Sequence, residues 1–280
     1  MHTKTELLAL LKANRLTLKK RLGQHYLIDP HTTRRLVSCC ELSPEDTVIE
    51  IGAGLGALTD ALAEAAREVV AVELDPGICA LLSRRLAGCA NIRVVCEDIL
   101  SFAWSAYPGA KVVGAIPYQI TAPILVSLCE HTPQVAGVWL GMQQEVATRL
   151  TARPGTKAFG RLTVLVQYRF VVEQLMRIPK AAFFPQPNVD SAWVRLTPRR
   201  NPAVAVCDEP VFFAVVRAAF GQRRKTLLNC LRHVTGPGLS REAAAEALRA
   251  ADLPPAVRGE ELSLEAFARL TNILADKRLA

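Results

Sequence analysis

The sequence lacks the usual arrangements of zinc ligands, although cysteine is not rare in it. None of its eight cysteines forms a C-x-x-C pair, and no cluster of histidines and cysteines has ligand spacing. Most of the thiols stand among apolar residues, which is typical of small core side chains in a reducing compartment. We therefore expect no metal site.

The sequence also lacks an apolar run long enough to cross a membrane. Its longest apolar stretches have the length of a strand, and the N-terminal run over residues 7–13 is interrupted by charge and has no cleavage site. No repeat or low-complexity tract occurs, and half of the residues are hydrophobic, which argues against disorder. We expect a cytoplasmic protein without a leader or a membrane anchor.

Acidic residues are fewer than basic ones. The 34 lysines and arginines exceed the 26 aspartates and glutamates, so the formal net charge is +8 and the pI is near 9.2. This excess favours an anionic partner, with nucleic acid ahead of a membrane surface. A chain of 280 residues can bury one sizeable core and a smaller second one.

A glycine turn between two apolar runs is the most informative stretch. Residues 48–51 lead into Gly52-Ala-Gly-Leu-Gly56, a helical segment follows, and a second apolar run over 70–75 contains Glu73. This order predicts a βαβ unit that holds a nucleoside. The glycines let the backbone turn tightly and approach a ligand, and the carboxylate of Glu73 can accept hydrogen bonds from both ribose hydroxyls.

The glycine pattern alone leaves three possibilities open. The spacing G-x-G-x-G suits an enzyme that uses S-adenosylmethionine, whereas Gly52-x-Gly54-x-x-Ala57 also fits the looser fingerprint of a nicotinamide cofactor. A βαβ unit without a ligand is the third possibility. The choice between them depends on the rest of the chain.

Strand-length and helical patterns alternate through the first two thirds of the chain. Strands are predicted around 48–51, 71–75, 92–96, 111–118, 135–142, 162–172 and 191–196, and helices at 5–16, 30–41, 58–67, 77–87, 122–129 and 143–152. This alternation predicts an α/β fold, a doubly wound Rossmann-like sheet of largely parallel strands with an antiparallel edge. After residue 197 the pattern is helical, at 209–220, 222–233, 240–250 and 263–275. We expect one domain over 1–197 and a small all-helical domain over 198–280.

Ligands of such sheets bind beyond the carboxyl ends of the strands, where the glycine turn, Glu73, Asp98 and the run 115–118 should meet. Asp98 fits a hydrogen bond from an adenine amino group, and its ordinary alternative is a helix N-cap. The turn Ile116-Pro-Tyr118 suits methylation of an adenine amine. That weakly nucleophilic nitrogen needs an acceptor, here a backbone carbonyl near Ile116, and an aromatic face such as Tyr118. A dehydrogenase has no use for such a turn, and a plain structural turn is the alternative.

These motifs resemble those of the small-subunit rRNA adenine N6,N6-dimethyltransferase family over nearly the whole chain. The runs that carry the resemblance are Leu22-Gly-Gln-His-Tyr-Leu-Ile-Asp29, Glu50-Ile-Gly-Ala-Gly-Leu-Gly56, Val72-Glu-Leu-Asp75, Glu97-Asp98, Ile116-Pro-Tyr118, Phe159-Gly-Arg-Leu-Thr163, Phe183-x-Pro-x-Pro-x-Val-Asp-Ser-Ala192 and Ala219-Phe-Gly-Gln-Arg-Arg-Lys-Thr226. The resemblance implies a methyltransferase domain, S-adenosylmethionine as methyl donor and the rRNA of the immature small ribosomal subunit as partner. Nothing in the sequence indicates an obligate dimer, so we expect a monomer.

The resemblance also implies roles for individual residues. The methyl donor would contact His25, Leu27, Gly52, Gly54, Gly56, Glu73, Leu74, Asp98, Ile99 and Ala115. The reaction would be carried by Ala115, Ile116, Pro117, Tyr118 and Phe183, with the target base between the two aromatic rings. The helical domain would grip rRNA with Gln222, Arg223, Arg224 and Lys225. Independently of the resemblance, the three consecutive cations Lys19, Lys20 and Arg21 are interpreted as a basic lip that meets phosphate. A solvated surface is the alternative for each basic run.

One position departs from the family's pattern. The family has Asn before Leu/Ile-Pro-Tyr, and this chain has Ala115. Alanine cannot supply the side-chain acceptor for the target amine, and loss of one such contact typically costs about a hundred- to a thousandfold in rate. Gln119 is a neighbour that could compensate. A catalytically weak RNA-binding assembly factor is therefore an alternative function. A methyltransferase of large-subunit rRNA is another, which the run 220–226 argues against.

Overall fold

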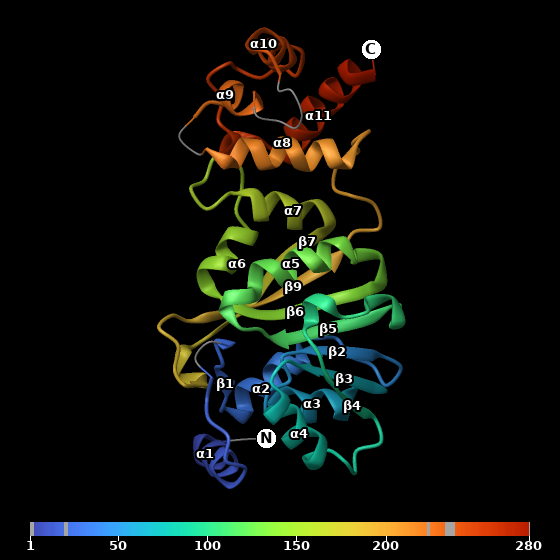
Figure 1. Cartoon of the computed structure of the whole chain (residues 1–280), viewed down its shortest axis with the longest axis vertical. Coiled ribbons are helices and arrows are strands. Elements are labelled where there is room, and N and C mark those ends of the chain that lie inside the picture. Colours follow the sequence, from blue (N-terminus) through green and yellow to red (C-terminus); the bar gives the residue numbers. More distant parts are fainter. Residues whose placement is uncertain (1–2, 20–21, 223–224, 233–238, 280) are drawn as a thin grey trace. The chain divides into compact units, whose positions relative to one another are not determined.

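The computed structural model of the protein describes residues 3–19, 22–222, 225–232 and 239–279. The chain forms two compact units (Figure 1). The first, here called the sheet unit, comprises Met1–Ala147 and Val171–Pro198. The second, the helical unit, comprises Thr148–Phe170 and Arg199–Ala280.

A seven-stranded sheet in the order β4-β3-β2-β5-β6-β9-β7 organises the sheet unit. The strands are β2 Thr47–Ile51, β3 Glu68–Glu73, β4 Ile92–Cys96, β5 Ala110–Ala115, β6 Val135–Gln143, β7 Phe170–Ile178 and β9 Ser191–Pro198. Strands β2 to β6 are parallel to one another, and β9 is antiparallel to β6. The predicted doubly wound sheet with an antiparallel edge is confirmed. Because β3 and β5 lie on opposite sides of β2, the strand order reverses there and leaves a crevice at the carboxyl ends.

The helices of the sheet unit are α1 Lys4–Ala13, α2 Pro30–Ser38, α3 Ala57–Ala65, α4 Pro76–Arg85, α5 Thr121–Glu130 and α6 Gln144–Leu150, of which the last continues into the helical unit. Asp29 caps α2 and Asp75 caps α4, and a proline follows each cap. Helices α2 and α3 contribute to a core that contains Trp139 and Trp193. A short antiparallel ladder joins β1 Tyr26–Leu27 to β8 Phe183–Phe184, so residues near the N-terminus meet the segment before β9.

The helical unit starts earlier in the chain than predicted. Its helices are α7 Arg161–Arg169, α8 Glu209–Gly221, α9 Leu227–Leu231, α10 Arg241–Ala250 and α11 Leu264–Leu279. The strand predicted at 162–172 is wrong for residues 162–169, which belong to helix α7, and β7 begins only at Phe170. Val164 and Tyr168 are one helical turn apart and both enter the core formed by α8, α9, α10 and α11. The β-branched composition of this stretch conceals that helical spacing, and its packing carries residues 148–170 into the second unit.

The helix predicted over 222–233 is shorter in the structure. Gln222 has a non-helical backbone, with φ −136° and ψ 75°, and ends α8, and α9 starts only after Thr226. Residues 223–224 and 233–238 lie outside the described residues. Across the part of the chain that the structure describes, no helix has the length and apolar character needed to cross a bilayer.

Candidate active site

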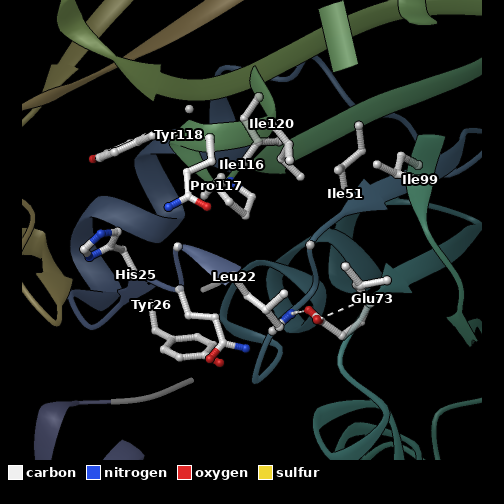
Figure 2. Close-up of a pocket in the computed structure, with 18 of the residues that line it drawn as sticks. Leu22, His25, Tyr26, Ile51, Glu73, Ile99, Ile116, Pro117, Tyr118 and Ile120 are labelled. Carbon is white, nitrogen blue, oxygen red and sulfur yellow. Dashed lines mark hydrogen bonds between the residues drawn. The ribbon is translucent and has the colours of Figure 1, made fainter. Parts of the chain in front are cut away.

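A cleft opens in the sheet unit at the carboxyl ends of β2, β3, β4 and β5. The space within it, counted together with the part open to solvent, is about 1040 Å³. His25 and Tyr118 lie on one side of it, and Glu73 and Ile99 lie on the other (Figure 2). The predicted residues that line it are His25, Gly52, Gly54, Glu73, Leu74, Asp98, Ile99, Ala115, Ile116, Pro117, Tyr118 and Phe183.

The three glycines of the turn have different neighbours, although all three have positive φ. At Gly52 a Cβ would meet only the ring of Pro117, at 3.9 Å, so this glycine faces the cleft. At Gly54 it would lie 2.9 Å from Cε1 of Tyr26, and at Gly56 it would lie 1.9 Å from Nη2 of Arg85. Gly56 therefore makes room for α4 and is absent from the cleft lining. The expected approach to a ligand applies to the first two glycines only.

Glu73 ends β3 with a buried carboxylate held by backbone N–H groups. Its Oε2 accepts a hydrogen bond from Gly54 N at 2.9 Å, and its Oε1 accepts from Leu74 N at 3.0 Å and Asp75 N at 2.9 Å. Burial raises the pKa of Glu73, and the three N–H groups oppose that rise. The group is therefore oriented by the glycine turn and by the start of α4 before any ligand arrives.

Asp98 is a helix N-cap and also part of the cleft lining. Its Oδ1 accepts from Leu100 N at 3.0 Å, which caps the short 3₁₀ helix Ile99–Ser101. The same side chain lines the cleft, beside the buried Ile99. Leu74 lines the cleft as well and is 48% exposed, so an apolar surface is available next to this carboxylate.

Strand β5 ends at Ala115, and the chain leaves it through Ile116 and Pro117. Ile116 N still donates to Gly141 O of β6 at 3.1 Å, so the turn begins from a fixed point. A 3₁₀ helix over Tyr118–Ile120 follows and faces Tyr118 and Gln119 to the cleft. The carboxamide carbon of Gln119 lies 3.7 Å from the position of a Cβ at Gly23.

The phenol of Tyr118 is constrained at its end and on its face. Its hydroxyl lies 2.8 Å from Oγ of Ser191, and its ring stacks on the imidazole of His25 at 5.5 Å and 28°. His25 Nδ1 lies 2.6 Å from the carbonyl oxygen of Pro185, which can only accept, so this nitrogen carries a proton. Burial raises the pKa of Tyr118, so the phenol stays neutral.

Several predicted residues lie elsewhere. Leu27 is buried and lines a smaller pocket beside the cleft, together with Glu50 and Ala115. Lys19 is not a free cation, because its Nζ lies 2.7 Å from Oδ1 of the buried Asp75. Lys20, Arg21, Arg223 and Arg224 lie outside the described residues, and Gln222 and Lys225 belong to the helical unit.

The cleft also contains residues that the sequence did not single out. Ser191, Tyr26 and Gln24 line it. Ser191 belongs to the run Phe183–Ala192 and Tyr26 to the run Leu22–Asp29, but no spacing rule assigns either a function. Gln24 and Lys19 both contact Asp75, at 3.4 Å and 2.7 Å, and this fastens the segment before β1 to the start of α4.

Comparison with known proteins finds close relatives of the whole chain. A sequence model of the family described as "Ribosomal RNA adenine dimethylase" matches residues 15–276. Two proteins named ribosomal RNA small subunit methyltransferase A are each 43% identical to the chain. The one from Geobacillus thermodenitrificans matches over 92% of this chain and 91% of its own length, and the one from Bacillus mycoides over 94% of both.

Solved structures share the architecture. The 23S rRNA methyltransferase ErmE is 30% identical, with a TM-score of 0.68 over 89% of this chain and 99% of its own. A dimethyladenosine transferase from Plasmodium falciparum is 24% identical, with a TM-score of 0.77 over 90% of this chain and 98% of its own. The second likeness concerns the fold alone.

Glu50, next to the cleft, predicts a pH dependence of stability. Burial raises its pKa to about 8 from an ordinary value of 4.5, and Oγ1 of Thr59 donates to it at 2.5 Å. Between pH 4.5 and about pH 8 the folded protein binds one proton more than the unfolded chain. The contribution of Glu50 to stability is therefore complete below pH 4.5 and is lost as the pH rises to about 8.

Replacing Glu50 by glutamine should remove this dependence, because the amide does not titrate. From about pH 5.5 to 7.5, the free energy of unfolding of the native protein should fall relative to that of Glu50→Gln by about 1.4 kcal/mol per pH unit. Chemical denaturation at several pH values measures it. The control is Glu64→Gln, which changes an exposed residue of α3. Its free energy of unfolding should depend on pH as that of the native protein does. Parallel curves for native protein and Glu50→Gln would contradict the prediction.

Proposed function

The chain belongs to the ribosomal RNA adenine dimethylase family, and from this premise we propose how its cleft serves the reaction. The protein is an S-adenosylmethionine-dependent enzyme that dimethylates adenines of small-subunit rRNA at N6. The observation that supports the assignment of the site is that one cleft presents the oriented carboxylate of Glu73 opposite the aromatic face of Tyr118.

The residues of the cleft fit S-adenosylmethionine. The carboxylate of Glu73 would accept hydrogen bonds from the ribose hydroxyls, Asp98 would accept one from the adenine amine, and Ile99 with Leu74 would cover the adenine ring. Gly52, whose open face borders the cleft, would contact the methionine part. When bound, the donor supplies an electrophilic methyl group on a sulfonium.

The opposite side of the cleft suits the target adenine. The base stacks on Tyr118 and faces Phe183, which also lines the cleft. A backbone carbonyl near Ile116 accepts from the amine and holds its N–H bonds out of the plane of the ring, which localises the lone pair on the nitrogen. The proton that the amine loses passes to water or to a backbone acceptor. Two transfers of a methyl group to this nitrogen yield the dimethylated base.

The partner is the rRNA of an immature small ribosomal subunit, on which the protein acts as a monomer in the cytoplasm. Two relatives at 43% identity carry the name of a small-subunit enzyme, which favours this rRNA over that of the large subunit. The run Gln222–Lys225 in the helical unit supplies an amide and three cations for phosphate. Lys19 contributes little to this grip, because Asp75 neutralises it.

A second candidate function follows from Ala115. Its methyl group offers no acceptor to the target amine, so the chain could serve as an RNA-binding assembly factor with little catalysis. Gln119, which lines the cleft and reaches Gly23, is the amide placed to compensate.

Replacing Glu73 by alanine should abolish binding of the methyl donor. Two charge-assisted hydrogen bonds are lost, so we expect S-adenosylmethionine to bind at least about 100-fold more weakly in calorimetry. Affinity for rRNA should stay largely intact. The control is Glu130→Ala, which removes an exposed carboxylate at the end of α5. An unchanged donor affinity in Glu73→Ala would refute the ribose assignment.

Restoring the asparagine at position 115 tests the two candidate functions. Methyl incorporation from labelled S-adenosylmethionine is measured in small subunits that lack dimethyladenosine. If the missing acceptor limits the reaction, Ala115→Asn should transfer methyl groups about 100 to 1000 times faster than the native chain. Comparable rates would mean that the backbone, Tyr118 and Gln119 suffice. Transfer by the variant alone would favour the assembly factor.

The basic run before α9 should account for part of the affinity for rRNA. Replacing Arg223, Arg224 and Lys225 by alanine should weaken binding and lower the slope of log K against log salt by about 2, since fewer counterions are released. Filter binding at several salt concentrations measures it. The control replaces Arg241, Arg249 and Arg258, three exposed cations of the same unit. An unchanged slope in the first variant would make the run a solvated surface.

A further inference from the structure

We propose that Ser191 is a positioning residue, which holds the ring of Tyr118 in the orientation that receives the target adenine. The proposal rests on the function proposed above for Tyr118. It assigns a purpose to the antiparallel strand β9, whose first residue is Ser191.

The contact is a hydrogen bond within the cleft. The hydroxyl oxygen of Tyr118 and Oγ of Ser191 are 2.8 Å apart, and either group can donate. Ser191 is 1% exposed, so water does not compete for its hydroxyl. A hydrogen bond of this kind, shielded from solvent, holds its partners more firmly than one at the surface.

Ser191 is itself held by the sheet. It pairs with Gln143 in the ladder between β6 and β9, and the carbonyl oxygen of Asp190 accepts from Gln144 N at 3.0 Å. The carboxylate of Asp190 accepts from Lys180 N and from Nε of Arg177, both at 2.8 Å. The backbone that carries the hydroxyl is therefore held by the strand pairing of Ser191 and by the hydrogen bonds of Asp190, and a positioning group requires such support.

A second contact restrains the same ring in another direction. The imidazole of His25 covers one face of Tyr118, and Pro185 O fixes the imidazole through its Nδ1. Rotation of the phenol ring would break both its hydrogen bond with Ser191 and its stacking contact with His25. The ring is thus ordered before the base arrives, and less entropy is lost when it stacks.

The orientation of the ring can be measured without any activity. The chain has four tyrosines, so labelling with 3-fluorotyrosine gives a simple ¹⁹F spectrum, in which Tyr118→Phe identifies the resonance of Tyr118. In Ser191→Ala this resonance should move toward the position of free 3-fluorotyrosine and sharpen as the ring gains freedom. An unchanged resonance would overturn the proposal.

Thr132→Val is the matched control. Thr132 is buried in the same unit, and its hydroxyl donates to the carbonyl oxygens of Leu128 and Cys129, away from the cleft. This variant should lose stability like Ser191→Ala and leave the resonance of Tyr118 in place. A shift of equal size in the control would mean that loss of any buried hydroxyl loosens the ring, which also overturns the proposal.

Methyl transfer tests whether the orientation matters for the reaction. Ser191→Ala and Tyr118→Phe remove the same hydrogen bond from opposite ends, so each should lower kcat/KM by about 5- to 50-fold, with unchanged affinity for the donor. The double variant should be no slower than the slower single one. If the factor by which kcat/KM falls in the double variant is the product of the two single factors, Ser191 does not act through Tyr118. If Ser191→Ala does not fold, Tyr118→Phe still tests the proposal. A kcat/KM of this variant equal to that of the native protein would refute the role of the hydrogen bond between Tyr118 and Ser191.

These readouts separate the proposal from the proposed function. If neither the native chain nor Ala115→Asn methylates small subunits, the proposed function fails, and the ¹⁹F spectra still decide whether Ser191 orders the ring. If methylation proceeds and the resonance of Tyr118 ignores Ser191, the proposed function stands and the positioning role falls.

Discussion

The buried carboxylate of Glu73 is the group on which the cleft depends. A carboxylate out of contact with water is costly unless hydrogen bonds compensate, and here three backbone N–H groups do so. One of them comes from Gly54 and two from the residues after β3, so the carboxylate ties the glycine turn to the next strand. The left-handed backbone of Gly52 and Gly54 is stable in this setting, and it brings the turn close to any ligand.

The other side of the cleft is built from segments far apart in the chain. His25 contacts Pro185 across 160 positions of sequence, and the pairing of β1 with β8 holds these segments together. Lys19 and Gln24 fasten the same N-terminal segment to Asp75, which caps α4. The side of the cleft that we assign to the donor thus comes from the consecutive βαβ units, whereas the side that we assign to the base needs the segment before β1 and the strand β9.

Prediction from sequence succeeded where short-range patterns decide. The parallel strands, the glycine turn, and the placement of Glu73, Asp98 and Tyr118 at strand ends all follow from local periodicity and from one topological rule. It failed at residues 162–169, where β-branched side chains suggest a strand. Val164 and Tyr168 instead share a helix face, because a core made by four later helices buries both. Propensity is a weak guide when tertiary packing opposes it.

By itself, then, the sequence determined the α/β architecture, the family and the set of groups at the strand ends. These depend on spacings within about thirty residues, which a linear pattern records. Only the tertiary structure decided how those groups are used: Gly56 faces Arg85 rather than the cleft, Lys19 is paired with Asp75, and Ser191 meets Tyr118. These contacts join residues that lie 29, 56 and 73 positions apart. Hydrogen bonds and ion pairs act over a few ångströms in space, and the chain path that closes those distances is a property of the whole fold.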